Sequence, residues 1–316
     1  MIVGSAVKMA RSIFPDPVQN WLKHAVYCRN CHLDPSRYRA ELSRWCWLLG
    51  SGRCDLAQPR TMIDKINWMK LYDSTPLKGR LADKYLVREW VAQRIGREYL
   101  VPLLGVWDCP GQIDFYALPD QFVLKVTHGS GWNIIVPDRS RLDIADARRR
   151  LAEWLTRRQA MKGGFEMHYE YCRPRIVCEK YLQDGTGGLR DYKFMVFDGV
   201  VQFAFTVDRL PGGTFRGTYL PDWTRAPFEY TCQAKRAQDV PAPRRLEEML
   251  AISQELGKGF ACVRVDLHEV DGRVLFGEMT FTDADGLAKF LPPSYDREFG
   301  DRIVLPDKKP FKGVML

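Results

Sequence analysis

The spacing of apolar residues predicts that the chain begins with helices. Across residues 61–72 the apolar positions recur mainly at helical spacing, and Pro76 is expected to end this helix. A second helix is expected over residues 81–95. Residues 1–60 are rich in Trp, Arg and Cys and read as further helices, one of which starts at Asp34-Pro35-Ser36.

Short apolar runs predict strands in the rest of the chain. Phe122–Val126 is such a run, and residues 127–133 after it are rich in glycine. Asp198-Gly199 separates two further runs, and this dipeptide is the strongest short signal for a hairpin. The other expected elements are strands at 100–104, 134–136 and 176–182, a helix over 143–161, a loop over 208–243, a helix over 246–256 and a strand pair over 260–267 and 274–280.

Composition limits the class of protein. With 46% hydrophobic and 27% charged residues, the 316-residue chain is globular, and largely disordered or fibrous classes are excluded. A net charge of +8 favours nucleotides, carboxylates, anionic polymers or nucleic acid as partners without choosing among them. No apolar run approaches the roughly 20 residues that cross a bilayer. Residues 1–14 lack signal-peptide features, so we expect a cytoplasmic location and an amphipathic helix, packed on the fold or against a membrane surface.

The nine cysteines are scattered, which indicates free thiols in a reducing compartment. Residues 28–32 read C-x-x-C-H, the attachment pattern of c-type haem, but no export signal accompanies it. Cys46 and Cys54 do not form the second C-x-x-C pair of a zinc site. Free thiols are therefore the expected state, and the alternatives are zinc binding and haem or redox chemistry.

Lys125 is a charged residue inside an apolar predicted strand. A buried lysine is costly unless it meets an anion. The glycine-rich turn that follows can bring backbone N–H groups to phosphate oxygens. Together these features suggest a triphosphate clamp. The alternative is a lysine that extends from an edge strand above an ordinary turn.

The last predicted strand pair carries a polar face. Arg264 and Asp266 alternate with apolar residues on one strand, and Glu278 and Thr280 share a face of the next. A two-residue turn at Asp271-Gly272 puts Asp266 and Glu278 on opposite faces, whereas an odd-length loop pairs them on one face. Two facing carboxylates repel unless a cation lies between them, and oxygen ligands suit Mg²⁺. Only the second register forms a metal site, so we expect that register. The alternative to a metal site is a salt-bridge cluster of Asp266 and Glu278 with Arg264.

Several segments together resemble the TupA-like ATP-grasp family. Thr61–Asp73 is similar to its T-x-x-[ED]-K-[IL]-x-W-[LM]-K-L segment, and the similarity extends from about residue 60 to 305. The other matching segments are Ala82–Glu89, Phe122–Gly131, Asp191–Phe194, Val263–Leu267 and Phe276–Phe281.

The resemblance implies an α+β fold in which two α+β subdomains clamp a nucleotide. The implied division is an N-terminal helical region over residues 1–75, a first subdomain with the lid loop over 76–180, a second subdomain with the metal site over 181–305, and a C-terminal tail over 306–316.

The resemblance also implies a role for individual residues, with ATP and Mg²⁺ as cofactors. Lys84 and Lys125 are expected to hold the phosphates, and Arg264 to steady the transferring phosphoryl group. The metal strand reads Glu278-Met279-Thr280 where the commonest pattern is Glu-x-Asn, which leaves the number of metal ions open. The loop residues expected to close over the phosphates are His128, Gly129, Ser130 and Gly131, and those expected at adenine are Glu179, Lys180, Tyr181 and Leu182. Asp191 and Lys193 are expected at the ribose or phosphates, and the expected catalytic residues are Lys193 and Arg264. The expected metal ligands are Asp266, Glu278 and Thr280.

The implied reaction joins a carboxylate and an amine through an acyl phosphate. The family is linked to teichuronopeptide and other surface-polysaccharide biosynthesis, so an amino acid and a uronic-acid glycan are the expected substrates, and nucleic acid is not an expected partner. One alternative is a polysaccharide-biosynthesis protein associated with glycosyl transfer. The other is a basic polymer-binding protein without catalysis, using the aromatic and basic residues at 37–47.

Overall fold

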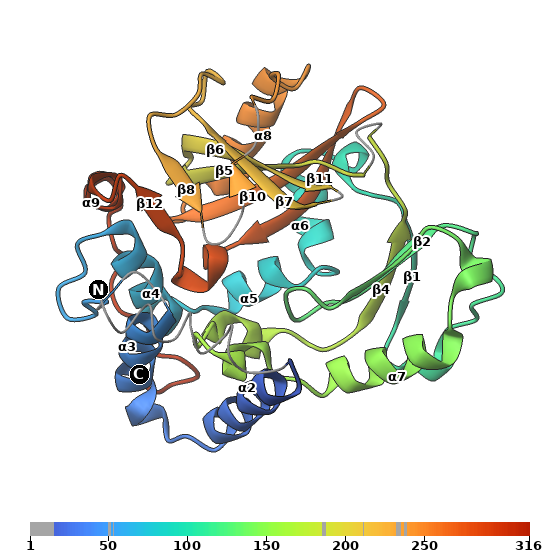
Figure 1. The fold of residues 1–316 in the computed structure, drawn as a ribbon, viewed down its shortest axis with the longest axis horizontal. Helices are drawn as coiled ribbons and strands as arrows, with labels where there is room; N and C mark the ends of the chain where they lie inside the picture. Colours follow the sequence, from blue (N-terminus) through green and yellow to red (C-terminus); the bar gives the residue numbers. More distant parts are fainter. Residues whose placement is uncertain are drawn as a thin grey trace.

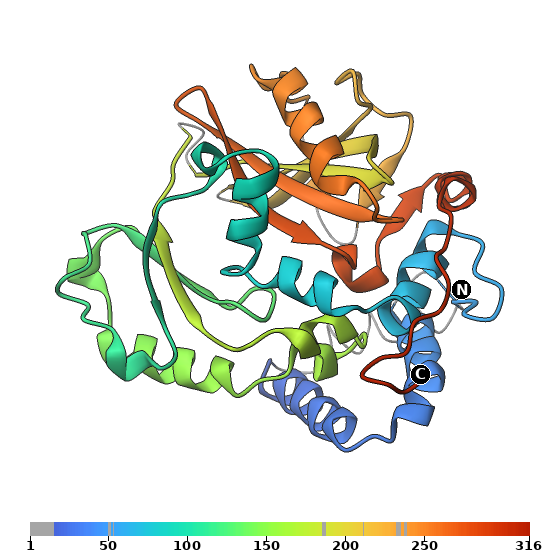
Figure 2. The same ribbon diagram turned by 180° about the vertical axis from the view of Figure 1, so that it is seen from behind.

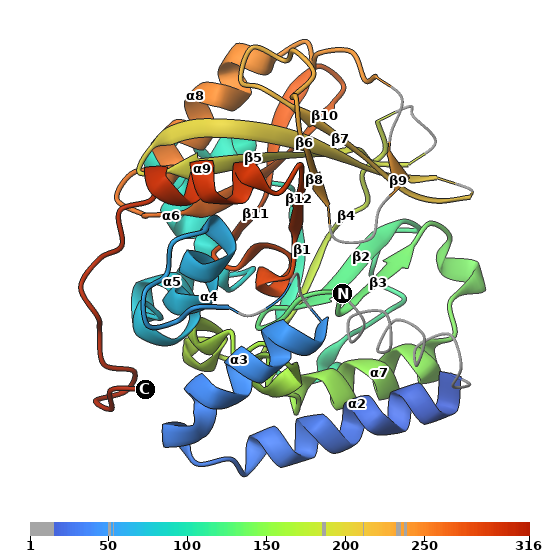
Figure 3. The ribbon, with the colours of Figure 1, turned by 60° about the vertical axis from the view of Figure 1, so that its left-hand side comes forward.

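A computed structural model of the chain describes residues 16–49, 52, 54–184, 188–210, 212–231, 235–236 and 239–316. The amphipathic helix expected over residues 1–14 lies outside these ranges. Helices α2 (Asp16–Cys31) and α3 (Tyr38–Leu49) confirm the helical reading of the N-terminal region (Figure 1). In Figure 3, α2 lies at the base of the molecule.

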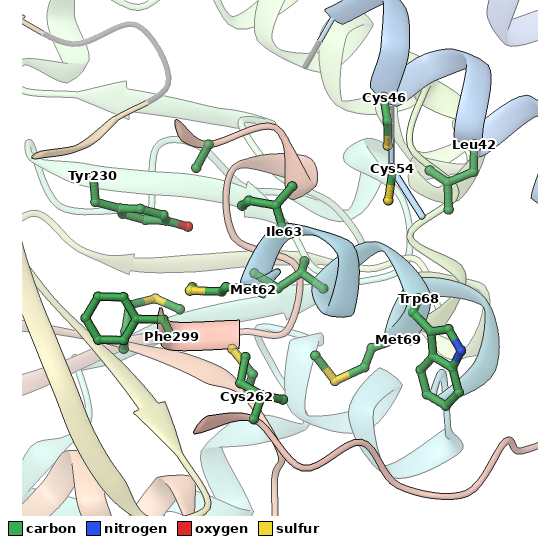
Figure 4. Packing of buried hydrophobic residues seen from close by; sticks show 14 of the residues in the cluster. Leu42, Cys46, Cys54, Met62, Ile63, Trp68, Met69, Tyr230, Cys262 and Phe299 are labelled. Carbon is green, nitrogen blue, oxygen red and sulfur yellow. The ribbon is translucent and has the colours of Figure 1, made fainter. Parts of the chain in front are cut away.

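Helix α4 (Met62–Tyr72) is the centre of the N-terminal core. Thr61 starts it, because the Thr61 hydroxyl accepts from the Asp64 amide and the Asp64 carboxylate accepts from the Thr61 amide, each at 3.1 Å. Met62, Ile63 and Met69 then pack among side chains from distant segments, including Phe299 of α9 (Ser294–Arg302) (Figure 4). The predicted helix over 61–72 is confirmed.

The single helix predicted over residues 81–95 is wrong. The chain forms α5 (Pro76–Ala82) and α6 (Val87–Arg94), with a break at Asp83. Pro76 begins α5 instead of only ending the helix before it, since the first turn of a helix needs no N–H from proline. The Asp83 carboxylate accepts from the amides of Tyr85 and Leu86 at 2.9 and 3.0 Å and so replaces helical hydrogen bonds.

A four-stranded antiparallel sheet follows, with the strand order β1-β4-β2-β3. Helix α7 (Ile144–Leu155) covers one face and buries Ala147 and Leu151 against Phe122 and Leu124 (Figure 1). Since side chains alternate across a strand, Lys125 and Glu179 lie on the opposite face. The strands are β1 (Leu103–Trp107), β2 (Phe122–Val126), β3 (Asn133–Val136) and β4 (Ile176–Lys180).

The second sheet has six strands in the order β11-β10-β5-β6-β7-β9. Helix α8 (Leu246–Gly257) packs on one face together with α6 (Figure 2). The opposite face is apolar at one end, where Met195 and Phe203 meet the α4 core, and charged at the other. The strands are β5 (Asp191–Phe197), β6 (Val200–Leu210), β7 (Gly213–Tyr219), β9 (Lys235–Arg236), β10 (Val263–Val270) and β11 (Arg273–Thr280).

The expected hairpin at Asp198-Gly199 is confirmed, because β5 and β6 flank it. The expected loop over 208–243 is wrong in part, since β6 reaches Leu210 and three more strands lie in that stretch. The remaining elements are β8 (Glu229–Thr231), which pairs with β12 (Lys289–Leu291), helix α9 (Ser294–Arg302), and the 3₁₀ turns η1 (Pro35–Arg37), η2 (Arg97–Tyr99), η3 (Pro110–Gln112), η4 (Arg139–Arg141), η5 (Gln159–Lys162), η6 (Met167–Tyr171) and η7 (Asp283–Gly286).

The last hairpin has the predicted register, but for a different reason. Asp266 pairs with Glu278, as expected for one shared polar face. The turn, however, is the two-residue Asp271-Gly272 turn, in which both residues have positive φ of 52° and 72°. A β-bulge at Gly277 adds one residue to β11 and restores the pairing. The expectation of an odd-length loop is therefore wrong.

Candidate functional site

Two lysines and a carboxylate form the first part of the site, on the face of the four-stranded sheet that α7 leaves uncovered. The Lys125 ammonium pairs with Glu179 Oε2 at 2.6 Å, and Arg88 reaches Glu179 Oε1 at 3.3 Å. Lys84 donates to the Gly129 carbonyl at 2.5 Å. Burial lowers the pKa of Lys84, Glu278 opposes this and Lys125 adds to it. Lys84 therefore lies within electrostatic reach of both sheets.

The glycine-rich loop is anchored by His128 and exposed at its tip. His128 is buried, and its Nε2 donates to the Arg157 carbonyl at 3.0 Å. Burial lowers the pKa of His128, so the imidazole is neutral near pH 7. Ser130 and Gly131 are exposed, and Gly131 has a φ of +77°. The His128 side chain thus fixes the base of the loop, while the following residues stay accessible.

Arg264 organises the second part of the site, on the charged end of the six-stranded sheet. Its Nε and Nη2 donate to the two oxygens of Asp266 at 2.5 and 2.8 Å. The same Nη2 donates to Glu278 Oε1 at 2.8 Å, and Nη1 donates to Asp283. One guanidinium therefore bridges three carboxylates, two of which are almost completely buried.

Lys193 and Asp191 extend this cluster along β5. The Lys193 ammonium donates to Asp266, its register partner on β10, and lies 3.6 Å from Asp191. Arg209 pairs with Asp191 at 2.8 Å, and His268 lies 3.5 Å from it. Burial would raise the pKa of Asp191, but Lys193, His268 and Arg209 outweigh it and hold the carboxylate ionised.

The two predicted carboxylate ligands have opposite electrostatic environments. Burial raises the pKa of Asp266, although Arg264 and Lys193 oppose this. Burial would also raise the pKa of Glu278, but Arg264, Lys193 and Lys84 outweigh it and lower the pKa to about 2. Glu278 is therefore ionised at neutral pH, and its side chain is 42% exposed.

The structure brings the expected metal ligands together, with the positively charged side chain of Arg264 between them. Asp266, Glu278 and Thr280 lie on one face, but the guanidinium of Arg264 bridges the two carboxylates. The expectation that these two carboxylates repel each other in the absence of a metal ion is therefore wrong. Thr280 Oγ1 donates to Glu278 Oε1 at 3.2 Å and so supports that carboxylate. Within the described ranges, no group of three or more His, Cys, Asp or Glu residues is placed to hold a metal ion.

The donor set nevertheless suits one kind of metal ion. Among the described residues the side-chain hydrogen bonds of Glu278 involve Oε1, and the side chain as a whole is 42% exposed. Mg²⁺ is bound in proteins through one or two carboxylates, with phosphates and water completing its shell. Glu278, with Asp266 beside it, fits that requirement.

The expected adenine contacts lie at the end of β4. The Lys180 amide donates to the Pro102 carbonyl at 3.0 Å, and Leu182 packs beside Val101. Tyr181 follows, with its hydroxyl accepting from Gln183 at 3.3 Å. The Glu179 side chain points instead to Lys125 and Arg88, so its carboxylate belongs with the lysines.

Sequence reasoning missed several charged residues of the site. Arg88 lies within a segment that carried the family resemblance, so a signal for it was present. Asp283 and Asp285 lie in a polar run directly after the last strand, and Lys70 follows Trp68 in the first motif. Glu166 has no recognisable signal, because it lies between the helix predicted over residues 143–161 and the strand predicted over 176–182, in a stretch with no predicted element.

The family of the chain follows from a comparison with protein-family models. The model described as TupA-like ATPgrasp matches residues 64–304. The chain belongs to the TupA-like ATP-grasp family. The α+β ATP-grasp fold expected from the sequence is thereby confirmed, and α2 and α3 lie outside the matched region.

Solved structures share a more distant similarity with the chain. The D-cycloserine synthetase DcsG is 20% identical with a TM-score of 0.40, covering 72% of this chain and 70% of that one. The D-alanine–D-alanine ligase of Bacillus anthracis complexed with ATP is 15% identical with a TM-score of 0.37, covering 64% and 55%. The Helicobacter pylori D-alanine–D-alanine ligase is 12% identical with a TM-score of 0.39, covering 72% and 60%. The chain thus spans little more than half the length of these two ligases.

No curated protein is similar enough to match the chain. Among the helices that the structure describes, none has the length and apolar character needed to cross a membrane.

Replacing Arg264 is expected to destabilise the protein strongly. Arg264→Met leaves the buried carboxylates of Asp266 and Asp283 without their shared partner, and breaking such a pair costs about 3–5 kcal/mol. Urea unfolding measures the change. Adding Asp283→Asn should recover part of the loss, whereas Arg297→Met, which breaks an exposed pair with Asp301, should cost less than about 1 kcal/mol. Equal losses for the two arginine variants would contradict the role of Arg264.

Proposed function

We propose that this protein is an ATP-dependent ligase that joins a carboxylate to an amine through an acyl phosphate. The observation that supports this most is that the two sheets each present a charged face, and that the two faces carry different kinds of charged residues. One face carries Lys84, Lys125 and the glycine-rich loop, which suit phosphates, and the other carries Arg264 and Glu278. The charges of both Glu278 and Lys125 act on Lys84, which supports a position for its ammonium between the two faces.

The site suits phosphoryl transfer because it offers positioning and charge neutralisation. Lys84 and Lys125 would bind the phosphates, and the Gly129–Gly131 amides would close over them. Arg264 would stabilise the charge that develops on the transferring group. Glu278 and Asp266 would hold Mg²⁺, which neutralises phosphate charge when bound. The carboxylate substrate attacks the terminal phosphorus, ADP leaves, and the amine then displaces phosphate from the acyl phosphate.

For the substrates we propose an amino acid and a uronic-acid glycan or its precursor. The family resemblance supports this choice, together with the basic character of the chain, whose net charge is +8. A polysaccharide-biosynthesis role in the cell envelope, performed from the cytoplasm, is the corresponding cellular context.

The aromatic residues near the N-terminus disfavour a polymer-binding protein without catalysis. Tyr38 is buried and stacks on Phe165 with ring centroids 4.8 Å apart. Trp45 lies against Gly163, where the ring would overlap any added side chain. Trp47 is 47% exposed. Two of the three aromatics therefore pack the fold instead of presenting faces to a polymer.

ADP release tests the proposed reaction. Mg-ATP is supplied with D-glucuronate or D-galacturonate, free or within an oligosaccharide, and with each amino acid in turn. We expect ADP and phosphate to appear only when a matching acid and amine are both present, with a new amide detected by mass spectrometry. A protein that neither binds nor hydrolyses ATP, and whose retention on an anionic polymer depends on salt but not on ATP, is instead a polymer-binding protein.

Replacing Lys125 is expected to weaken nucleotide binding. A charge-assisted hydrogen bond contributes about 1.5–3 kcal/mol, so Lys125→Met should raise the Kd of a non-hydrolysable Mg-ATP analogue about 10- to 150-fold. Calorimetric titration measures this change. Lys258→Met, which removes an exposed lysine paired with Glu255, is the matched control and should leave the Kd unchanged. An unchanged Kd for Lys125→Met would contradict the phosphate clamp.

The loop over residues 128–133 is expected to become protected when nucleotide binds. Its Ser130 amide has only a long contact, 3.5 Å, to Gln159 Oε1, so it exchanges readily in the free protein. Hydrogen exchange should slow at Gly129–Gly131 upon addition of Mg-ATP, while β6 serves as the unaffected reference. Equal exchange in both states would remove the lid role of the loop.

A further inference from the structure

Glu166 is a buried carboxylate whose hydrogen-bond partners are uncharged. It precedes η6 and is 8% exposed. Gln159 Nε2 donates to it at 2.8 Å, and the Thr282 hydroxyl donates to its other oxygen. Over the described part of the chain, no lysine, arginine or histidine forms an ion pair with it. A buried carboxylate without a cation is costly, which suggests that the position serves the chemistry.

These two partners connect Glu166 to both halves of the proposed site. Thr282 precedes Asp283, which accepts from Arg264. Gln159 contacts the Ser130 amide of the lid loop through its Oε1 at 3.5 Å. Glu166 therefore lies where the lid, the phosphoryl-transfer arginine and the segment after β11 meet.

The segment after β11 is held in an unfavourable backbone conformation. Ala284, Asp285 and Gly286 have successive φ values of 50°, 54° and 62°, in the left-handed region that residues other than glycine rarely adopt. Asn67 and Lys70 of α4 maintain it. Asn67 Nδ2 donates to the Gly286 carbonyl at 2.9 Å, and the Lys70 ammonium donates to both the carbonyl and the carboxylate of Asp285 at 2.7 Å.

The result is a polar cluster with an accessible end and a buried end. The Asp285 side chain is 31% exposed, whereas Lys70 is fully buried. Gly164 packs against this pair so closely that a side chain there would overlap Asp285 Oδ1 and Lys70 Nζ. Glu166 is linked to this pair through Thr282, whose hydroxyl donates to Glu166 and whose carbonyl accepts from the Asp285 amide at 3.0 Å.

The surroundings of Glu166 shift its pKa from that of an ordinary glutamate to near neutral pH. Burial and the Asp285 carboxylate raise the pKa of Glu166 to about 7, against the lowering effects of Lys70 and of the Thr282 and Gln159 hydrogen bonds. Tyr169 and His168 face the same region from η6, and both are neutral: burial raises the pKa of Tyr169 and lowers that of His168 to about 3. A general base works best with a pKa near the working pH.

We propose that Glu166 accepts the proton which the amine substrate must lose, and that Asp285 binds the incoming ammonium group. This inference rests on the proposed ligase function. The ammonium gives one proton to Glu166, and the nitrogen lone pair attacks the acyl-phosphate carbon. The C–N bond forms, the C–O bond to phosphate breaks, phosphate leaves with the electron pair, and it takes the second proton of the nitrogen.

Carbon-13 NMR of glutamate-labelled protein tests the first requirement without turnover. The Glu166 resonance is identified by its absence from Glu166→Gln and titrated in the presence of a non-hydrolysable Mg-ATP analogue. A midpoint near neutral pH is expected. A midpoint below about pH 5, close to that of an ordinary glutamate, overturns the proposal.

Two small nucleophiles test the chemical role. Hydroxylamine is uncharged at about pH 8, whereas ammonia is mostly protonated and needs a base. With the acid that supports ADP release, Glu166→Gln should lose about 100-fold or more of the rate with ammonium chloride and keep the hydroxamate-forming rate with hydroxylamine. Glu166→Asp should recover part of the ammonia rate. Glu170→Gln, in the 3₁₀ turn η6 that follows Glu166 and paired with Arg158, is the control and should change neither rate.

The outcomes separate this inference from the proposed function. If the wild-type protein forms no hydroxamate with any acid, the ligase function fails and the role of Glu166 fails with it. If the wild type is active and Glu166→Gln loses both rates equally, or neither, the ligase stands and Glu166 is not the base. Selective loss of the ammonia rate, with recovery in Glu166→Asp, supports the proposal.

Discussion

The guanidinium of Arg264 is shared by three carboxylates, and the arrangement of the second sheet depends on it. Asp266 and Asp283 are buried beside it, and Glu278 lies at its outer edge. Three negative charges so close together are unfavourable without a delocalised cation that can donate in several directions. The β-bulge at Gly277 is the backbone feature that makes this possible, because it places Glu278 on the face of Asp266.

The same interaction links the strands to the N-terminal helices. Asp283, held by Arg264, begins the strained segment that Asn67 and Lys70 of α4 keep in place. Helix α4 therefore does more than pack the core, because its polar residues hold the end of the strand that carries Glu278. This explains why a helical motif outside the two sheets accompanies the charged strands.

The charged residues of the proposed site gather on one face of each sheet for a simple reason. Each has one face covered by a helix, α7 or α8, and alternation of side chains sends the charged residues to the other face. On the smaller sheet this face carries Lys125 paired with Glu179. A bound phosphate can replace the Glu179 carboxylate as the partner of Lys125. On the larger sheet it carries Arg264 and its carboxylates, which suit a transferring phosphoryl group and a metal ion.

The sequence by itself determined the local elements and the chemical types of the site. Capping at Thr61, the Asp198-Gly199 hairpin and the alternation around Arg264 are local patterns that need no distant partner. Family motifs indicated Lys84, Lys125, Asp266 and Glu278. Only the tertiary structure decided how these charges are paired. The bulge at Gly277, the pairing of Lys125 with Glu179 and the environment of Glu166, which forms no ion pair among the described residues, depend on contacts between residues far apart in the chain, and the sequence pattern carries no information on such distances.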